Sequence, residues 1–375
     1  MKTFNVGIVG AGHIAEKMAA TLSRMEDASC LAIASRTLSK ARAFASRFDI
    51  PRSYGSYDEL IADPDIDLVY VATPHTHHFD VTRRAILAGK PCLVEKSFMA
   101  DASEAAAIIA LAREKGVFVA EAIWPRYMPV REIAREVLAS GVIGKPVTAF
   151  ASLAYNVSSK ERVLSPELGG GALLDLGVYL LNFVRMYFDE PIEQISSACI
   201  LAETGVDASE SINLTLSGGI LATLQASGWS QGDNQGVIAG TTGYLVFDDL
   251  INPTRLKVCR KRHVVEREIE LPDQITGFEY QVRACRDAIE AGLVEPPRCP
   301  MPKPSTSCTS WTGSAPNGAS KALNSSAILP AAGPIATCCT ICPIFMHQLA
   351  MPSHLMHILR RFYAAAGFTF VCRSL

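Results

Sequence analysis

The sequence has almost no net charge and lacks the features of a secretory signal peptide. Its 35 Lys and Arg residues nearly balance 37 Asp and Glu residues, which leaves a formal net charge of −2. No whole-chain field therefore recruits nucleic acid or an acidic membrane. The first residues enter an apolar segment without the basic region, apolar stretch and cleavage site of a signal peptide. We expect a cytoplasmic protein with no nucleic-acid or membrane partner.

The 11 cysteines lack the even, short spacing of a disulfide framework. The one close set, Cys338, Cys339 and Cys342, has no second pair and no suitably placed histidine, so we predict no metal site. The length of 375 residues suits two domains, and the 49% hydrophobic content suits a globular protein.

Acidic residues are absent from the last part of the chain. The final one is Glu295, and residues 296–375 contain neither Asp nor Glu, although the first 295 residues hold all 37. Within this part, the stretch Ala322–Leu359 has no charged residue and is long enough to cross a membrane. Its four prolines argue against a spanning helix.

A reading-frame shift near Glu295 would explain this composition. When Arg298–Pro302 is back-translated and read one nucleotide earlier, permitted codons encode E-M-P-H-A, and those of Lys303–Lys321 can encode Q-A-E-H-L-V-H-E-L-D-G-L-R-A-E-W-G-V-K. The hidden peptide is acidic and has a helical period. Residues 296–375 are therefore set apart as an atypical tail, which we expect to be disordered or poorly packed.

The chain opens with a nucleotide-binding fingerprint. An apolar strand ending at Gly10 leads into the G-x-G-x-x-A sequence of residues 10–15 and then into a helical segment reaching about Arg24. Gly10 permits the tight turn, and Gly12 lets the backbone approach a pyrophosphate. Ala15 allows close packing of the helix, whose N-terminus supplies N–H donors.

Strand and helix continue to alternate. Strands are predicted at 30–35, 67–72, 91–95 and 117–120, and helices at 77–88 and 102–115. This repetition predicts a doubly wound parallel sheet in which ligands lie beyond the carboxyl ends of the strands. We predict that residues 1–122 form a Rossmann domain.

The second strand ends in Ser35-Arg36-Thr37 rather than in an acid that would accept from a ribose 2′-hydroxyl. A guanidinium between two hydroxyls suits a 2′-phosphate, so we predict NADP, with NAD as the alternative. Three histidines follow a later strand, where cofactor-loop contacts are favoured over metal binding. The residues predicted to contact the cofactor are Gly10, Gly12, His13, Ile14, Ser35, Arg36, Thr73, Pro74, His78, Glu95, Lys96, Trp124 and Arg126.

Residues 123–295 are predicted to form a second α/β domain. Strand-like runs occur at 147–155, 195–202, 211–216, 220–226, 235–239 and 244–247. The alternation of Ile212, Leu214 and Leu216 indicates a mostly antiparallel sheet with one covered face.

Taken together, the fingerprint, the Glu95-Lys96-Ser97 sequence and the glycine-rich run from Gly169 to Tyr179 resemble the glucose–fructose oxidoreductase/inositol dehydrogenase/MocA family. Its dimeric dihydrodiol dehydrogenases and NADP-linked xylose dehydrogenases are the most similar branch. The resemblance covers residues 3 to 295. It implies an NADP-dependent dehydrogenase or reductase for a sugar, polyol or cyclic diol, and a homodimer formed through the open sheet.

The resemblance also implies catalytic residues. Lys96 matches the lysine of the family's E-K-P motif, with Ser97 in place of proline, while Asp175 and Tyr179 match the helix that follows the glycine-rich run. Asp175 and Tyr179 are four apart and share a helix face. A tyrosine with the usual pKa of about 10 is weakly ionised at neutral pH, and a nearby ammonium lowers that pKa. We predict Tyr179 as acid/base, Lys96 as its electrostatic partner and substrate anchor, and Asp175 as an orienting acceptor.

Two other functions stay open. One is a dinucleotide-binding sensor of the same fold without catalysis, and the other is an inactive product of a frameshifted gene. Substrate specificity is expected from residues 124–127, 155–162 and 229–234.

Overall fold

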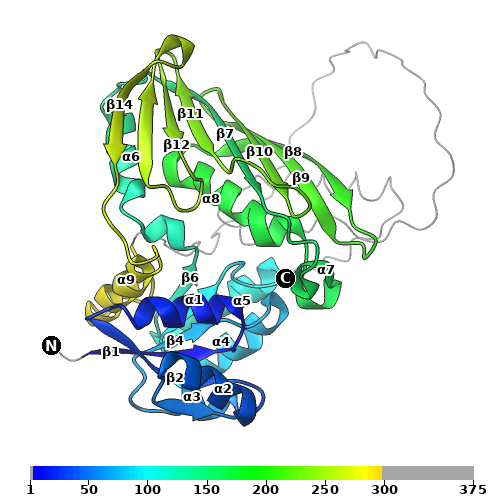
Figure 1. Ribbon diagram of the computed structural model, residues 1–375, viewed down its shortest axis with the longest axis vertical. Helices are drawn as coiled ribbons and strands as arrows, with labels where there is room; N and C mark the ends of the chain where they lie inside the picture. The colour runs from blue at the N-terminus through cyan, green and yellow to red at the C-terminus, as the bar shows by residue number, and fades with distance from the viewer. Residues whose placement is uncertain (1–2, 298–375) are drawn as a thin grey trace, which may run out of the picture.

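The computed structural model describes residues 3–297. Two lobes, each built on one sheet, lie above one another (Figure 1). The predictions for residues 298–375, including the membrane-spanning alternative and the poorly packed tail, lie outside the described residues.

The first lobe is a doubly wound sheet of six parallel strands in the order β3-β2-β1-β4-β5-β6. The order reverses between β1 and β4, which creates the crevice where such sheets bind ligands. Its strands are β1 (Phe4–Val9), β2 (Ala28–Ala34), β3 (Arg52–Tyr54), β4 (Leu68–Val71), β5 (Cys92–Glu95) and β6 (Val119–Ala122). Its helices are α1 (His13–Leu22), α2 (Leu38–Phe48), α3 (Tyr57–Ile61), α4 (His78–Leu87) and α5 (Ala102–Lys115), with the 3₁₀ turn η1 (His75–His77) before α4.

The strands β4, β5 and β6 consist mostly of apolar residues, with one glutamate each in β5 and β6, and every residue is buried, as expected where helices cover both sides of a parallel sheet. Tight packing at the switch point also fixes Gly10, which has a φ of 103°. A Cβ there would lie 2.6 Å from the carbonyl oxygen of Ala72, at the end of β4.

The second lobe carries an eight-stranded sheet in the order β14-β13-β12-β11-β7-β10-β9-β8. Only β7 and β10 pair in parallel, so the predicted mostly antiparallel sheet is confirmed. Its strands are β7 (Pro146–Ala154), β8 (Ile192–Leu201), β9 (Asp207–Leu216), β10 (Ile220–Ser227), β11 (Gly236–Gly240), β12 (Tyr244–Phe247), β13 (Arg255–Cys259) and β14 (Val265–Glu270). The turn η5 (Lys261–His263) joins β13 to β14.

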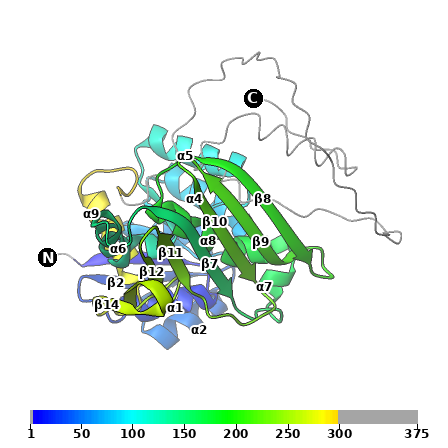
Figure 2. The same ribbon diagram turned by 90° about the horizontal axis from the view of Figure 1, so that it is seen from above.

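One face of this sheet is covered and the other is open. Ile212, Leu214 and Leu216 are buried as predicted, on the side where helix α8 (Val178–Tyr187) packs (Figure 2). On the opposite face, Phe150 of β7 and Leu221 of β10 are about half exposed. The remaining elements before strand β8 are η2 (Trp124–Tyr127), α6 (Val130–Ala139), α7 (Glu161–Leu164), η3 (Pro166–Leu168) and the π-helical turn η4 (Leu173–Gly177).

One segment of the described chain, Pro166–Tyr187, has the length and hydropathy of a membrane helix. Most of it is buried inside the fold, because α8 is the core helix beneath the sheet. Its apolar composition is explained by that packing.

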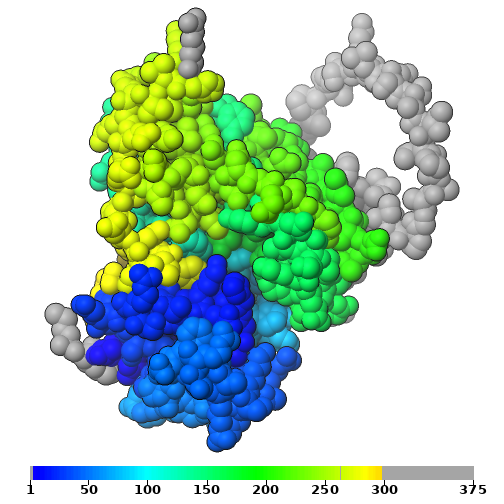
Figure 3. Space-filling view, in the orientation of Figure 1, coloured from blue at the N-terminus to red at the C-terminus, as the bar shows by residue number. Residues whose placement is uncertain are grey.

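The last described helix, α9 (Glu279–Glu290), returns to the first lobe. Arg283 and Arg286 donate to the carboxylate of Asp27 at distances from 2.6 to 3.3 Å. After α9, the chain adds a backbone hydrogen bond from Val119 N–H to the carbonyl of Val294. The α9 segment therefore packs against the first lobe, where its yellow surface adjoins the blue one in the space-filling view (Figure 3).

Candidate active site

A cleft of about 610 Å³ lies between the carboxyl ends of the first sheet and the second lobe. Its volume is within the range of small-molecule sites. First-lobe residues on its wall are Gly12, His13, Ile14, Lys17, Ala72, Thr73, Pro74, His75, Glu95 and Lys96. Second-lobe residues are Tyr155, Asn156, Val157, Lys160, Arg162, Leu168, Asp175, Leu176, Tyr179, Gln231 and Ile251.

The glycine loop is shaped to receive a dinucleotide. Gly12 is exposed, and a Cβ added to it would meet nothing within 4 Å. Helix α1 begins after Gly12 without a side-chain cap, so its first N–H groups are left for a ligand. The Oγ1 of Thr73 is buried in the cleft wall with no hydrogen-bond partner among the described residues. The residues present therefore fit a pyrophosphate and a nicotinamide.

Ser35 and Arg36 follow β2 at the same edge of the sheet. Ser35 is buried and Arg36 is exposed. Burial raises the pKa of nearby Tyr57, while the charge of Arg36 opposes that rise. The guanidinium is therefore close to an aromatic side chain and free to meet an anion at the strand end.

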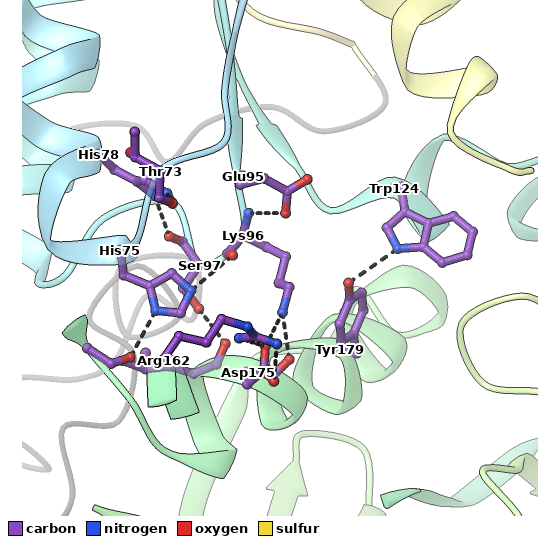
Figure 4. A network of polar contacts seen from close by, with 12 residues as sticks. Thr73, His75, His78, Glu95, Lys96, Ser97, Trp124, Arg162, Asp175 and Tyr179 are labelled. Atoms are coloured by element: carbon purple, nitrogen blue, oxygen red, sulfur yellow. Dashed lines mark hydrogen bonds and ion pairs between the residues drawn. The ribbon is translucent and has the colours of Figure 1, made fainter. Parts of the chain in front are cut away.

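The cleft floor contains a carboxylate shared by two cations (Figure 4). Lys96 Nζ donates to Asp175 Oδ1 at 2.8 Å, and Arg162 donates to both oxygens of that carboxylate, at 2.9 and 3.1 Å. The side chain of Asp175 is 7% exposed and that of Lys96 is 11% exposed. Burial opposes ionisation of Asp175, but the charge of Lys96 and the bonds from Arg162 outweigh it and hold its pKa well below the usual value.

Tyr179 lies beside this ion pair. The ammonium of Lys96 is 5.0 Å from the centre of the Tyr179 ring, and Trp124 Nε1 donates to the Tyr179 hydroxyl at 3.2 Å. Burial raises the pKa of Tyr179 to about 12, although the charge of Lys96 acts to lower it. The expectation of a lowered pKa is therefore wrong, because burial outweighs the effect of Lys96 and Asp175 also acts to raise the pKa.

The helix bearing Asp175 and Tyr179 is fixed at its start. Asp175 lies in the π-helical turn η4, a distortion that is common at functional sites. Asp207 accepts a hydrogen bond from the Leu173 N–H at 2.5 Å and so caps this turn. Gly171, with a φ of 113°, is required because a side chain there would collide with the Asp207 carboxylate. This contact explains the third glycine of the Gly169–Gly171 run.

A second buried carboxyl lies behind Lys96. Glu95 accepts from the hydroxyl of Tyr70 in a very short hydrogen bond and from the Lys96 N–H at 3.2 Å. Burial raises the pKa of Glu95 to about 7, against the lowering effect of the Tyr70 bond. This carboxyl therefore carries a partial charge at most near neutral pH.

Two histidines hold the loops around Lys96. The ring nitrogens of His75 lie 2.9 Å from the carbonyl oxygen of Gly169 and 3.1 Å from that of Lys96. Those of His78 lie near the carbonyl oxygens of Thr73, Ser97 and Phe98, at 2.8 to 3.1 Å. Burial lowers the pKa of both rings, to about 4 for His78. Within residues 3–297, no cluster of three potential metal ligands is present.

The structure brings Lys96, Asp175 and Tyr179 together in one cleft. Six predicted cofactor residues are not among those that line this cleft: Gly10, Ser35, Arg36, His78, Trp124 and Arg126. His78 is buried and holds the backbone carbonyls of Thr73, Ser97 and Phe98, and Trp124 reaches the cleft through its bond to Tyr179. Arg126 is buried near the carbonyl of Arg185.

Sequence reasoning placed Arg162 only within the stretch 155–162, expected to carry substrate specificity, and did not single out Asp207 or Tyr70. No local motif identifies them, because each depends on a partner distant in the chain. For Asp207, the one sequence signal is the third glycine of the Gly169–Gly171 run, which stands where the structure leaves no room for a side chain.

The fold and cleft define a two-domain oxidoreductase with a dinucleotide-binding Rossmann domain. Residues 4–122 match the oxidoreductase family with an NAD-binding Rossmann fold, and residues 132–246 match the GFO/IDH/MocA C-terminal domain. The chain belongs to the GFO/IDH/MocA oxidoreductase family.

Several known proteins are similar over most of their length. Trans-1,2-dihydrobenzene-1,2-diol dehydrogenase of Mus musculus is 35% identical over 79% of this chain and 91% of that protein. The enzyme of the same name from Xenopus tropicalis is 37% identical over 78% and 91%. A 3-ketoreductase from Actinomadura kijaniata, solved with NADP and TDP-benzene, has a TM-score of 0.72 at 27% identity, covering 78% of this chain and 91% of that one.

Proposed function

We propose that the protein is an NADP(H)-dependent dehydrogenase or reductase that transfers a hydride between the nicotinamide and a hydroxyl-bearing carbon of a sugar, polyol or cyclic diol. The observation that carries this proposal is the convergence of Lys96, Asp175 and Tyr179 on one cleft, beside the Thr73 loop of the Rossmann domain. Bound NADP(H) supplies or accepts the hydride.

Tyr179 is the proton donor and acceptor in this proposal. Its phenol keeps its proton at neutral pH, because burial raises its pKa to about 12, and is therefore ready to protonate the oxygen of a carbonyl being reduced. In the oxidising direction the same oxygen receives the hydroxyl proton, and the ammonium of Lys96 stabilises the phenolate that would otherwise form alone in a buried site.

Lys96 also anchors the substrate oxygen, and Asp175 holds Lys96 in place. An ammonium at 11% exposure has few stable positions unless a carboxylate fixes it, and the 2.8 Å bond to Asp175 does so. The Asp175 carboxylate therefore fixes the position of the Lys96 ammonium, and through it the position of the substrate oxygen.

The preference for NADP over NAD rests on Arg36. The end of β2 offers this exposed guanidinium and no acid, which favours a 2′-phosphate over a ribose hydroxyl. A 3-ketoreductase of the same fold was solved with NADP, which supports the choice.

Support for a hydroxylated ring as substrate comes from the remaining cleft wall. Tyr155, Asn156 and Gln231 offer polar groups, and Leu176 and Ile251 offer apolar contact. The names of the relatives, dihydrodiol dehydrogenases and a 3-ketoreductase, point to diols and sugars. The xylose dehydrogenase activity that the family resemblance implies would be one example of a sugar substrate.

We also propose a homodimer through the open face of the second sheet. Phe150 and Leu221 leave apolar side chains about half exposed there, on adjacent strands. Light scattering of the protein and of Phe150→Asp tests this. A monomeric parent would contradict it.

Turnover of a panel of aldoses, cyclic diols and diketones with NADP(H) and NAD(H) tests the proposed function. We expect at least one class to be turned over with NADP(H) preferred. Tight NADPH binding without turnover of any class would favour a non-catalytic sensor instead.

A further inference from the structure

The charge of the cleft wall is unbalanced. It carries four basic side chains, Lys17, Lys96, Lys160 and Arg162, but only two carboxyls, Glu95 and Asp175. A cleft with an excess of one sign concentrates ligands of the other sign.

Both carboxyls are already engaged inside the wall. Asp175 accepts from Lys96 and from both terminal nitrogens of Arg162. Glu95 is 5% exposed and bonded to Tyr70, and burial raises its pKa to about 7. Neither acid is therefore available to neutralise a cation elsewhere in the cleft.

Lys17 and Lys160 are the cations left over. Both are exposed, and neither forms an ion pair with any residue between 3 and 297. Lys17 projects from α1 in the first lobe, and Lys160 precedes α7 in the second, so they belong to opposite walls of one cleft.

Arg162 lies between Lys160 and the reacting centre. Two of its nitrogens bond Asp175, yet its side chain remains 49% exposed, so further N–H donors reach the cleft. Lys160 is only two residues away along the chain. Cationic groups therefore extend outward from Lys96 along the second-lobe wall.

We infer that the natural substrate is a hydroxylated ring bearing an anionic group, phosphate or carboxylate, which is contacted by Lys160 and Arg162 while the reacting carbon lies at Tyr179. This inference rests on the proposed function for the identity of the reacting end. The anionic end is recognised by cationic groups of the second-lobe wall that the proposed proton transfer does not use. Lys17, on the helix that begins at the glycine loop, is left to the cofactor phosphates, so Lys160 is the residue that tests the substrate anion.

The test compares Lys160→Gln with Lys261→Gln, a control at another exposed lysine, outside the cleft wall in the turn between β13 and β14. Specificity constants, kcat/KM, are measured with NADP for D-glucose, D-glucose 6-phosphate and D-glucuronate. We expect one anionic sugar to be preferred over glucose by about tenfold or more, with the preference reduced about tenfold in Lys160→Gln and unchanged in Lys261→Gln. Whichever of D-glucose 6-phosphate and D-glucuronate has the higher kcat/KM shows whether the anionic group is a phosphate or a carboxylate.

A binding measurement keeps this test independent of turnover. Inorganic pyrophosphate is titrated calorimetrically onto the NADP-saturated full-length protein and onto both variants. Binding that weakens only in Lys160→Gln supports the anion site even if no sugar is turned over, in which case the proposed function alone fails. Equal turnover of neutral and anionic sugars, no pyrophosphate binding, or a weakened Kd for NADPH in Lys160→Gln would overturn the inference.

Discussion

Asp175→Asn removes the one negative charge that Lys96 and Arg162 share, while keeping the size of the side chain. The substitution leaves the ammonium of Lys96, at 11% exposure, without its carboxylate. Removing one partner of a buried pair costs about 3–5 kcal/mol. Arg162 is half exposed and can turn to solvent, so the lower end, about 3 kcal/mol, applies.

The same loss should appear in catalysis, because a displaced Lys96 no longer aligns the substrate oxygen. If about 3 kcal/mol is lost from the transition state, kcat/KM falls on the order of a hundredfold. The pH profile gives a second signature. The charge of Asp175 acts to raise the pKa of Tyr179, so its removal lowers that pKa, and alcohol oxidation should begin its alkaline rise at a lower pH than in the parent.

Steady-state kinetics between pH 6 and 10 and urea unfolding measure both effects. Asp189→Asn is the matched control, because that carboxylate pairs with Arg135 at 79% exposure and should change stability by less than about 0.5 kcal/mol. The reasoning is refuted if Asp175→Asn keeps kcat/KM within threefold of the parent and leaves the pH profile in place.

Four further outcomes are expected. Tyr179→Phe should reduce kcat by about a hundredfold or more while the Kd for NADPH stays nearly constant, and an unchanged rate would assign the proton to another group. Arg36→Ala should weaken NADP(H) binding by about 1.5–3 kcal/mol but hardly affect NAD(H); equal affinities in the parent would contradict the preference. Glu210 is buried with one oxygen unpartnered among the described residues, and burial raises its pKa to about 8 from 4.5, so the folded state keeps a proton that the unfolded state releases. Glu210 should therefore contribute a fall in the free energy of unfolding as pH rises from 4.5 to 8, by at most about 5 kcal/mol, and Glu210→Gln should remove that contribution from the slope in urea titrations; the same slope in both proteins would rule it out. Resequencing the coding DNA around Glu295 should reveal codons that permit the hidden acidic peptide, and the frame-restored protein should melt higher; incompatible codons would dismiss the frameshift.

Much of the fold follows from local pattern. The glycine fingerprint, the apolar strands and the alternation through Ile212 predict the two sheets, because each signal is long or chemically specific. Elements between residues 38 and 61 were not predicted. Helix α2 buries Ala41, Phe44 and Ala45, which have helical spacing, but two of the three are small alanines and the apolar signal is weak. Strand β3 has three half-buried residues and leaves no clear period.

The site shows where local reasoning stops. The motifs identify Lys96, Asp175 and Tyr179, and one electrostatic argument follows: an ammonium near a phenol lowers its pKa. That argument fails in this cleft because Lys96 does not act alone. Asp175 offsets its charge, and burial of the phenol outweighs what remains. The sign of the pKa shift is therefore set by burial and by a three-residue charge network. That network forms only when Arg162, in α7, folds against Asp175 in the π-helical turn thirteen residues further on.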